Sequence, residues 1–524
     1  DGGIVLMEAG TGVGKSFAYL VPLLRWAQAN RERTIVSTNT INLQEQLVGK
    51  DLPLLRRALS TADYTPTFAL LKGWRNYLCL SRLQLAGAGQ QSLLEPERQE
   101  EVVSIAEWAT RTRDGTLGDL PFTPSHEVWD EVAAEPDLCT RLKCPHFEAC
   151  FLFKARRQAA EADVVVVNHH LLAADLSVRR ASENWQDAAV LPPYQRLILD
   201  EAHHLEDVAA NHLGVQVGSR GIRRLLGRFE RSGRGLLPAL AAELSSSKDL
   251  LSQASLDLLR QRLMPAVVDA RRASELLLTR IMTRLEEPGM GTMRLDEEFA
   301  RDPIWDDGLG RELEATLGAF RELQGLVETI ADRMSQIEST DRRTQMLGEM
   351  RGVVRRLESA SDGLNATLRP PAGGPPTVRW LERTGPRGSQ VAMNAVPLDL
   401  APVLKDLLFD RLKTVVLTSA TLAASGDFGF LESRIGLQGE DSPVTTREIL
   451  PSPFDYGAQC LFGVPQDFPD PREDEAGHDA AIAKAVQEVA WASDGGCSSF
   501  SPVMPLCGGR RRNCGGALIR AGHS

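Results

Sequence analysis

The sequence predicts an α/β fold built around a parallel sheet. The apolar run 4–7 leads through the glycine-rich segment 9–16 into a helical pattern, which is the strand, loop and helix order of a phosphate-binding loop. A second apolar run, 197–199, ends in Asp200 and Glu201 and reads as a buried strand. Parallel strands place the glycine-rich segment and the two carboxylates at the same carboxyl edge of the sheet, where ligands bind.

The phosphate loop has the sequence AGTGVGKS. Its glycines permit a tight turn and let backbone N–H groups approach phosphate oxygens. Lys15 supplies a positive charge to the outer phosphates, and the Ser16 hydroxyl can ligate Mg2+. A glycine-rich turn beside a chance lysine is the alternative, but the hydroxyl and the strand–helix context favour a nucleotide site. We expect ATP to be bound by Gly10, Thr11, Gly12, Gly14, Lys15 and Ser16.

Asp200 and Glu201 open the tetrapeptide Asp-Glu-Ala-His, which ends at His203. An isolated Asp-Glu pair is usually part of a solvated loop, but this pair follows an apolar strand downstream of a phosphate loop. Phosphoryl transfer needs a metal ligand and a group that positions the attacking water. We therefore expect Asp200, with Ser16, to hold Mg2+ and Glu201 to orient or deprotonate the water.

Length and composition are those of a globular chain with several domains. The chain has 524 residues, of which 43% are hydrophobic and 25% charged. No stretch approaches the ~20 apolar residues of a membrane span, so no membrane contact is expected. The net charge of −11 argues against coating nucleic acid but leaves room for a local basic groove. The chain starts at Asp1 without a signal peptide, which predicts absent upstream sequence and a cytoplasmic location.

Four of the eight cysteines form a pattern: Cys79, Cys139, Cys144 and Cys150. Their spacing matches neither a paired C-x2-C zinc ribbon nor a thioredoxin-type C-x-x-C. Disulfides do not suit a chain without a secretory signal. Four thiolates can hold a [4Fe-4S] cluster or one Zn2+, and buried cysteines without a ligand are a third reading. The spacing alone leaves these readings open.

Seven short segments, spread over most of the chain, recur in the same order in one protein family. They are 8–16, 37–47, 72–79, 167–172, 200–203, 417–422 and 452–456. On these segments the sequence resembles the DinG-type helicases of superfamily 2, relatives of XPD. One departure is Trp74, where these helicases more often carry arginine, and the neighbouring Arg75 can take that role.

The resemblance implies ATP hydrolysis coupled to 5'-to-3' movement along single-stranded DNA and unwinding of forked duplexes, in DNA repair or replication. The polarity comes from the family and from no residue in this chain. The resemblance also implies a coupling role for His203, Ser419 and Thr421, whereas His169 and His170 are expected to be structural. A monomer is expected. The implied cofactors are ATP, Mg2+ and a [4Fe-4S] cluster on Cys79, Cys139, Cys144 and Cys150.

Residues 37–46 suit a strand-to-helix turn whose hydroxyl and amide groups bind nucleic-acid phosphates without reading bases. We expect Thr38, Asn39 and Thr40 to make these contacts. Trp74 and Tyr77 suit either base stacking or the small core beside the cysteines. Backbone contacts do not distinguish DNA from RNA, so an RNA-directed motor stays an alternative.

The resemblance further implies a P-loop, RecA-like motor domain with two inserts. Apolar residues recur at helical spacing through 256–270 and 323–337, which predicts an all-α insert, the family's arch domain. Strands near 378–381 and 391–393 are expected to return to the motor domain. The predicted boundaries are 1–72, 161–213 and 377–425 for the first motor domain, 73–160 for the iron–sulfur insert, 214–376 for the arch and 426–496 for the start of a second RecA-like domain.

The final 28 residues, 497–524, contain no Asp, Glu or Lys and show no periodic apolar face. Back-translation with a shift of one base near codon 496 yields a strand ending in Phe-Thr-Ser-Tyr, the family's motif IV. We hypothesise that this tail is out of frame. A superfamily 2 motor closes ATP between two lobes, and the second lobe supplies arginines. The chain alone is therefore expected to hydrolyse ATP poorly, and a truncated nucleotide- or nucleic-acid-binding remnant is the alternative function.

Overall fold

The computed structural model describes residues 2–493 except 11, 88–97, 137, 232, 248, 288–290, 338–339, 370–375, 386–387, 440–441, 461 and 472. The expectations for Thr11 and for the tail 497–524 lie outside the described residues. The chain forms two compact units, Asp1–Pro453 and Phe454–Ser524. Within the described ranges, none of the helices combines the length and apolarity that crossing a membrane requires.

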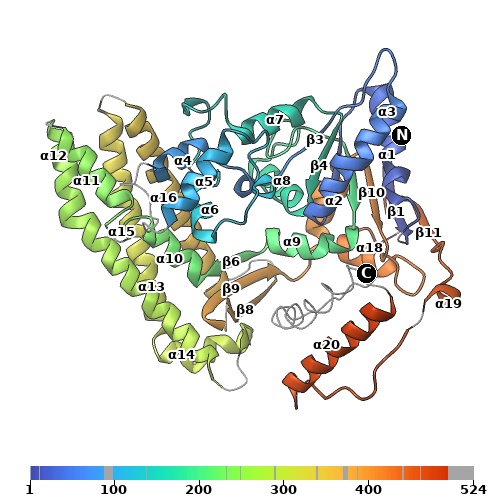
Figure 1. Ribbon diagram of the computed structural model, residues 1–524. Helices are drawn as coiled ribbons and strands as arrows, with labels where there is room; N and C mark the ends of the chain where they lie inside the picture. Colours follow the sequence, from blue (N-terminus) through green and yellow to red (C-terminus); the bar gives the residue numbers. More distant parts are fainter. Residues whose placement is uncertain are drawn as a thin grey trace. The chain divides into compact units, whose positions relative to one another are not determined.

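A seven-stranded sheet in which neighbouring strands run parallel organises the first unit (Figure 1). The α/β class and the parallel sheet predicted from sequence are confirmed. The strand order is β11-β1-β10-β5-β2-β4-β3. The strands are β1 (Gly3–Ala9), β2 (Thr34–Thr38), β3 (Phe68–Leu70), β4 (Val164–Asn168), β5 (Arg196–Asp200), β10 (Thr414–Ser419) and β11 (Val444–Leu450).

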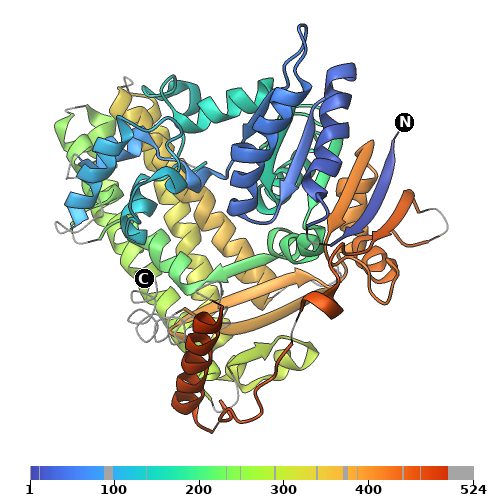
Figure 2. The same cartoon turned by 45° about the vertical axis from the view of Figure 1, so that its right-hand side comes forward.

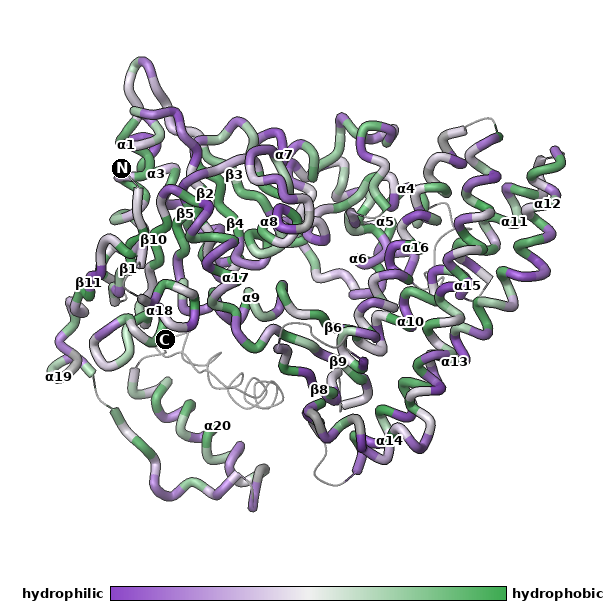
Figure 3. The backbone as a smooth tube through the Cα atoms, turned by 180° about the vertical axis from the view of Figure 1, so that it is seen from behind, coloured by the Kyte–Doolittle hydropathy of each residue, from purple (hydrophilic) through white to green (hydrophobic). Residues whose placement is uncertain are grey.

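Helices cover both faces of this sheet, and its strands are therefore apolar on both sides. In β4, Val164 and Val166 face the core under α1 and α3, while Val165 and Val167 face the core under α8 and α9. Figure 3 shows β4 and β5 as mainly hydrophobic. The helices are α1 (Lys15–Asn30), α2 (Ile41–Gln46), the turn Leu47–Asp51 and α3 (Leu52–Leu59) on one side, and α8 (His169–Ser182), α9 (Leu205–Leu213), α17 (Ala401–Leu404), the turn Lys405–Phe409 and α18 (Gly429–Ile435) on the other.

The chain between β3 and β4 carries the four patterned cysteines and folds around a small core of its own. Leu78, Ile105 and Val128 are buried in this core. Tyr77 is also buried, and its hydroxyl accepts a hydrogen bond from the backbone N–H of Lys72 at 3.0 Å. Tyr77 is therefore a core residue and not a stacking surface. The helices here are α4 (Leu80–Gly87), α5 (Gln99–Ala109), α6 (His126–Val132) and α7 (Phe151–Glu161), with short turns Trp74–Asn76, Leu117–Asp119 and Arg141–Lys143.

The chain between β5 and β10 is mostly helical, as its apolar periodicity predicts. Leu259, Leu263 and Val267 are buried, as are Leu323 and Val327 on the second predicted stripe. The two long helices that follow each other, α15 and α16, pack side by side (Figures 1 and 2). The helices are α10 (Ser219–Gly227), α11 (Leu236–Ser246), α12 (Leu250–Leu258), the turn Leu259–Leu263, α13 (Met264–Leu285), the turn Glu297–Arg301, α14 (Pro303–Asp306), α15 (Leu309–Ser335) and α16 (Asp341–Leu368).

The two predicted strands near 378–381 and 391–393 are present, but they form a sheet separate from the parallel one. This antiparallel sheet has the order β6-β9-β8-β7. Leu381 and Met393 are buried in the same core as the helices between β5 and β10. β8 and β9 pair antiparallel with each other and extend the helical region. The strands are β6 (Val215–Gly218), β7 (Thr292–Arg294), β8 (Thr377–Thr384) and β9 (Gln390–Pro397).

The second unit, taken by itself, contains two described helices. These are the short α19 (Tyr456–Gln459) and the longer α20 (Glu475–Ala492). The Asp474 side chain caps the start of α20 by accepting a hydrogen bond from the Gly477 backbone N–H at 2.8 Å.

Candidate nucleotide site and cysteine site

The phosphate loop joins the end of β1 to the start of α1. Gly12 and Gly14 have φ angles of 82° and 80°, in the left-handed region that favours glycine. A Cβ atom on Gly14 would meet nothing within 4 Å, so its backbone conformation and not lack of space requires glycine. Lys15 and Ser16 follow as the first residues of α1. The described part of the loop therefore has the strand, turn and helix geometry predicted from its sequence.

Lys15 reaches across to the end of β5. Its Nζ lies 2.8 Å from Glu201 Oε1 and 3.5 Å from Asp200 Oδ1. The two carboxylates are thus paired with the cation that the sequence assigns to the outer phosphates of ATP. A nucleotide that enters this site must compete with Glu201 for the ammonium group.

Asp200 is buried at the carboxyl end of β5. The Tyr19 hydroxyl donates a hydrogen bond to its Oδ2 at 3.1 Å. Burial raises the pKa of Asp200, while the charge of Lys15 acts in the opposite direction. The pKa of Tyr19 is also raised, first by burial and then by the neighbouring Asp200 charge. Tyr19 therefore stays protonated and serves as a fixed hydrogen-bond donor.

Glu201 follows directly, in a left-handed backbone conformation with φ 58°. Such a conformation is strained for a non-glycine residue and recurs at functional sites. Its Oε2 accepts a hydrogen bond from the Ser419 hydroxyl at 3.1 Å and lies 3.5 Å from His203 Nδ1. Burial alone would raise the pKa of Glu201, but the contacts with Lys15, Ser419 and His203 outweigh it and lower the pKa. Glu201 is thus held as a carboxylate.

Ser419 reaches this site because β10 lies between β1 and β5. Its hydroxyl is 2.6 Å from His203 Nδ1. Burial and the neighbouring His204 lower the pKa of His203. Thr421 is exposed, and its backbone N–H points at the Ser419 hydroxyl at 3.3 Å. The structure therefore brings together Lys15, Asp200, Glu201, His203 and Ser419, with Thr421 beside them through its backbone.

The four patterned cysteines line one cavity, although they come from separate parts of the segment. Burial raises the pKa of Cys79 to about 11, and the charges of Cys150 and Cys139 add to the rise. Burial likewise raises the pKa of Cys139, with Cys150 and Cys144 contributing. The four thiols are therefore near neighbours. In the described residues, no group of three or more His, Cys, Asp or Glu side chains closes to metal-ligand distance.

The donor set at this cavity suits a soft metal or cluster. The backbone N–H of Arg141 points at Cys139 Sγ at 3.4 Å, and such bonds stabilise a thiolate. Trp74, Phe147 and Phe153 also line the cavity and limit access of water. His146 and Glu135 line the same cavity, but the sequence pattern assigns the ligand role to the four thiols. Four thiols match the chemistry of an iron–sulfur cluster and equally of Zn2+.

Comparison with known proteins identifies the chain's relatives. No family model matches the chain. It is 30% identical over 496 residues to the ATP-dependent DNA helicase YoaA of Escherichia coli K12, an alignment that covers 94% of this chain and 67% of that protein. The chain belongs to the DinG/YoaA family of ATP-dependent DNA helicases. It is also 29% identical over 518 residues to the ATP-dependent helicase DinG of Mycobacterium tuberculosis H37Ra, with 95% and 68% covered.

The chain spans about two thirds of the length of these two relatives. Among solved structures, Xpd4 of S. tokodaii aligns with 98% of this chain and 70% of its own, at 11% identity and a TM-score of 0.39.

The segment expected to contact DNA in this DinG/YoaA chain lies at the end of β2 and the start of α2. Thr40 is exposed, and its Oγ1 accepts a hydrogen bond from the Leu43 backbone N–H at 3.3 Å. Asn39 is half-buried, whereas Thr38 is fully buried, with no partner for its hydroxyl among the described residues. Asn39 and Thr40 are therefore the members of this set that can reach a ligand.

His169 and His170 differ in environment. His169 is buried, its Nδ1 lies 2.7 Å from the Ser37 hydroxyl, and burial lowers its pKa to about 4. It is a neutral core histidine, as expected from the sequence. His170 is exposed, and its Nδ1 lies 3.2 Å from Nε2 of His212.

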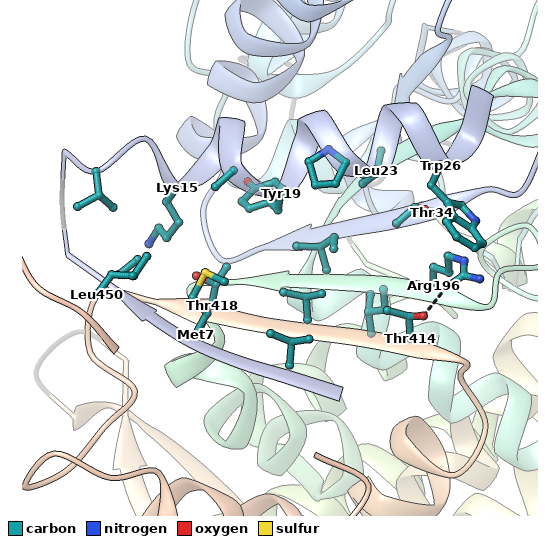
Figure 4. Close-up of a pocket in the computed structure, with 18 residues that line it drawn as sticks. Met7, Lys15, Tyr19, Leu23, Trp26, Thr34, Arg196, Thr414, Thr418 and Leu450 are labelled. Atoms are coloured by element: carbon teal, nitrogen blue, oxygen red, sulfur yellow. Dashed lines mark hydrogen bonds between the residues drawn. The ribbon is translucent and has the colours of Figure 1, made fainter. Parts of the chain in front are cut away.

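A largely apolar cavity of about 330 Å³ separates α1 from β1, β10 and β5 (Figure 4). Lys15 and Tyr19 lie toward one end, and Arg196, which hydrogen-bonds Thr414, lies toward the other. Thr418 projects into this cavity, and its buried hydroxyl has no partner in the described part of the chain.

Two residues of the nucleotide site were not predicted from the sequence. Tyr19 lies one helical turn after Lys15, and that spacing was the available signal. Glu8 precedes the phosphate loop within a segment that matches the family, but no role was assigned to it.

Proposed function

We propose that this chain is the ATP-binding part of a DNA helicase that hydrolyses ATP, moves 5'-to-3' along single-stranded DNA and unwinds forked duplexes during DNA repair or replication. The observation that carries the proposal is the meeting of Lys15, Asp200, Glu201 and Ser419 at the carboxyl edge of one parallel sheet. The polarity and the repair role rest on the family resemblance. We further propose a cytoplasmic monomer.

The proposed roles follow from the geometry. Lys15 would turn from Glu201 to the outer phosphates, and Asp200, held by Tyr19, would complete the Mg2+ shell with Ser16. Glu201, kept ionised, would orient or deprotonate the attacking water. Ser419 and His203 link that carboxylate to β10, in keeping with a coupling role. Asn39 and Thr40 would contact the DNA backbone.

The test is ATP hydrolysis by this chain with single-stranded DNA, single-stranded RNA or neither. We expect slow, DNA-stimulated turnover that Lys15→Ala abolishes and the exposed control Lys50→Ala preserves. Greater stimulation by RNA would favour an RNA-directed motor. Mg-ATP binding without turnover would favour the hydrolysis-deficient remnant. Forks with a single 5' or 3' tail, unwound by the full-length protein, would test the polarity.

We also propose that Cys79, Cys139, Cys144 and Cys150 hold a [4Fe-4S] cluster. The support is the cavity that the four thiols share and the family resemblance. When bound, such a cluster would cross-link the loops that carry these cysteines and stabilise the small domain. The proposed iron–sulfur insert (73–160) and helical arch (214–376) would together help enclose the DNA strand.

Metal analysis of anaerobically purified protein tests this assignment. We expect about four iron and four sulfide per chain. Cys144→Ser should lose most of the iron, whereas the control Cys460→Ser, an exposed cysteine outside the pattern, should retain it. Stoichiometric zinc without iron would contradict the cluster.

A further inference from the structure

The Glu8 carboxylate accepts two short hydrogen bonds from backbone N–H groups next to the candidate nucleotide site. Its Oε2 accepts the backbone N–H of Leu422 at 2.7 Å and that of Ala423 at 2.6 Å. These two residues follow β10, so the carboxylate joins the end of β1 to a turn that is more than 400 positions away in sequence. The strand register also places Glu8 opposite Ser419. The turn that follows Ser419 is therefore anchored to the strand that leads into the phosphate loop.

The Ser419 hydroxyl lies at the start of this turn and contacts three groups. This hydroxyl has one proton and two acceptor lone pairs. Its proton is donated to Glu201 Oε2 at 3.1 Å. Its oxygen accepts the Thr421 N–H at 3.3 Å and contacts His203 Nδ1 at 2.6 Å. Both lone pairs of the Ser419 oxygen accept a hydrogen bond only if His203 carries its proton on Nδ1. We assign this tautomer from the network.

We propose that Glu8 is a positioning residue for ATP hydrolysis: its carboxylate holds the turn 420–423 so that Ser419 restrains one oxygen of Glu201. The other oxygen, Oε1, is the one paired with Lys15. When a nucleotide takes Lys15, Oε1 becomes free to face the attacking water while Oε2 stays bound to Ser419. This inference rests on the proposed function of Glu201 as the residue that positions water.

A charged acceptor suits this task better than a neutral one. Hydrogen bonds from N–H groups to a carboxylate are shorter and stronger than those to an amide oxygen. Glu8→Gln keeps an acceptor of the same shape, so the turn should retain most of its geometry. Glu8→Ala leaves the N–H groups of Leu422 and Ala423 without this partner and should release the turn.

The experiment compares Glu8→Ala, Glu8→Gln and the control Glu32→Ala in the full chain. Glu32 is a useful control because its carboxylate also accepts two hydrogen bonds, from Trp26 and Arg196, but lies away from Ser419. The first readout is the ¹⁵N NMR signal of His203 without nucleotide, assigned with His203→Gln. The second is Mg-ATP turnover, with kcat and KM measured separately.

For Glu8→Ala we expect the Nδ1 signal of His203 to move toward the unprotonated position, and kcat to fall roughly 100-fold with little change in KM. Glu8→Gln should keep the His203 signal and kcat close to those of the wild type. Glu32→Ala should leave the His203 signal unchanged.

The proposal is overturned if Glu8→Ala lowers the stability of the protein to the same extent as Glu32→Ala and leaves the His203 signal in place. The NMR readout needs no turnover. A chain that does not hydrolyse ATP would therefore contradict the proposed function while still deciding whether Glu8 positions Ser419.

Discussion

Two adjacent carboxylates at the end of β5 have opposite environments. Asp200 is buried beside Tyr19 and has a raised pKa, whereas Glu201 contacts Lys15, Ser419 and His203 and has a lowered one. Neighbouring residues with different electrostatic surroundings can take different chemical roles. The proposed metal ligand and the proposed water-positioning group thus differ in their surroundings, although both are carboxylates.

The pairing of Lys15 with Glu201 predicts tighter nucleotide binding when the carboxylate charge is removed. In the wild type, a nucleotide must displace the Glu201 carboxylate from Lys15, which costs about 1 kcal/mol. Glu201→Gln removes this charge. We therefore expect a several-fold lower Kd for Mg-ATP together with loss of turnover. Titration of a fluorescent ATP analogue measures this. Glu206→Gln, at a half-buried carboxylate paired with Arg434, should leave the Kd unchanged. Weaker binding by Glu201→Gln would contradict the competition.

Thr418 predicts a stabilising substitution. Its hydroxyl is buried without a partner in the described chain, and valine has nearly the same shape without the polar group. We expect Thr418→Val to raise the free energy of unfolding by about 1 kcal/mol in urea titrations. The control Thr367→Val removes a hydroxyl that donates to the Gly363 carbonyl at 2.8 Å, so it should lower the free energy. Loss of stability in Thr418→Val would indicate a partner such as bound water.

At the scale of elements, one buried carboxylate joins the cysteine-bearing segment to the helical region. Glu135 contacts four arginines: Arg82 of α4, Arg224 of α10, Arg228 directly after α10, and Arg356 of α16. Burial alone would raise the pKa of Glu135, but these arginines lower it to about 2. Glu135 lies four positions before Cys139. Its contact with Arg224 therefore connects the cysteine-bearing segment to α10.

Glu135 therefore predicts an acid-sensitive junction. Its folded pKa is depressed, so its stabilisation is present above the unfolded pKa near 4.5 and is lost as pH falls toward about 2. Glu135→Gln should lower the free energy of unfolding by on the order of 3 kcal/mol at pH 7 and by progressively less below pH 4.5. Thermal unfolding across pH checks this. Glu275→Gln, in an exposed pair with Arg223, should cost under about 1 kcal/mol.

At the scale of the whole molecule, the sequence predicts local features more completely than long-range ones. The strand and helix that flank the glycine-rich loop, the strand before Asp200 and the apolar stripes of α13 and α15 each lie within one short window, and each is confirmed. The partners of Tyr19, Glu8 and Glu135 come from segments far away in sequence, and local periodicity does not encode such pairings. The same limit explains why β8 and β9 were expected near the parallel sheet, since a strand pattern does not name its neighbours.

The position of β10 beside β1 has a consequence for biosynthesis. Both neighbours of β1, β10 and β11, lie beyond residue 413, so the first strand has no pairing partner until most of the chain has left the ribosome. At translation rates of roughly 5–20 residues per second, that delay lasts tens of seconds. The helices between β5 and β10 are made in the interval and bury a core of their own. The nascent chain would thus fold the helices between β5 and β10 before its ATP site is formed. A ribosome that stalls before residue 414 would leave β1 without a neighbouring strand.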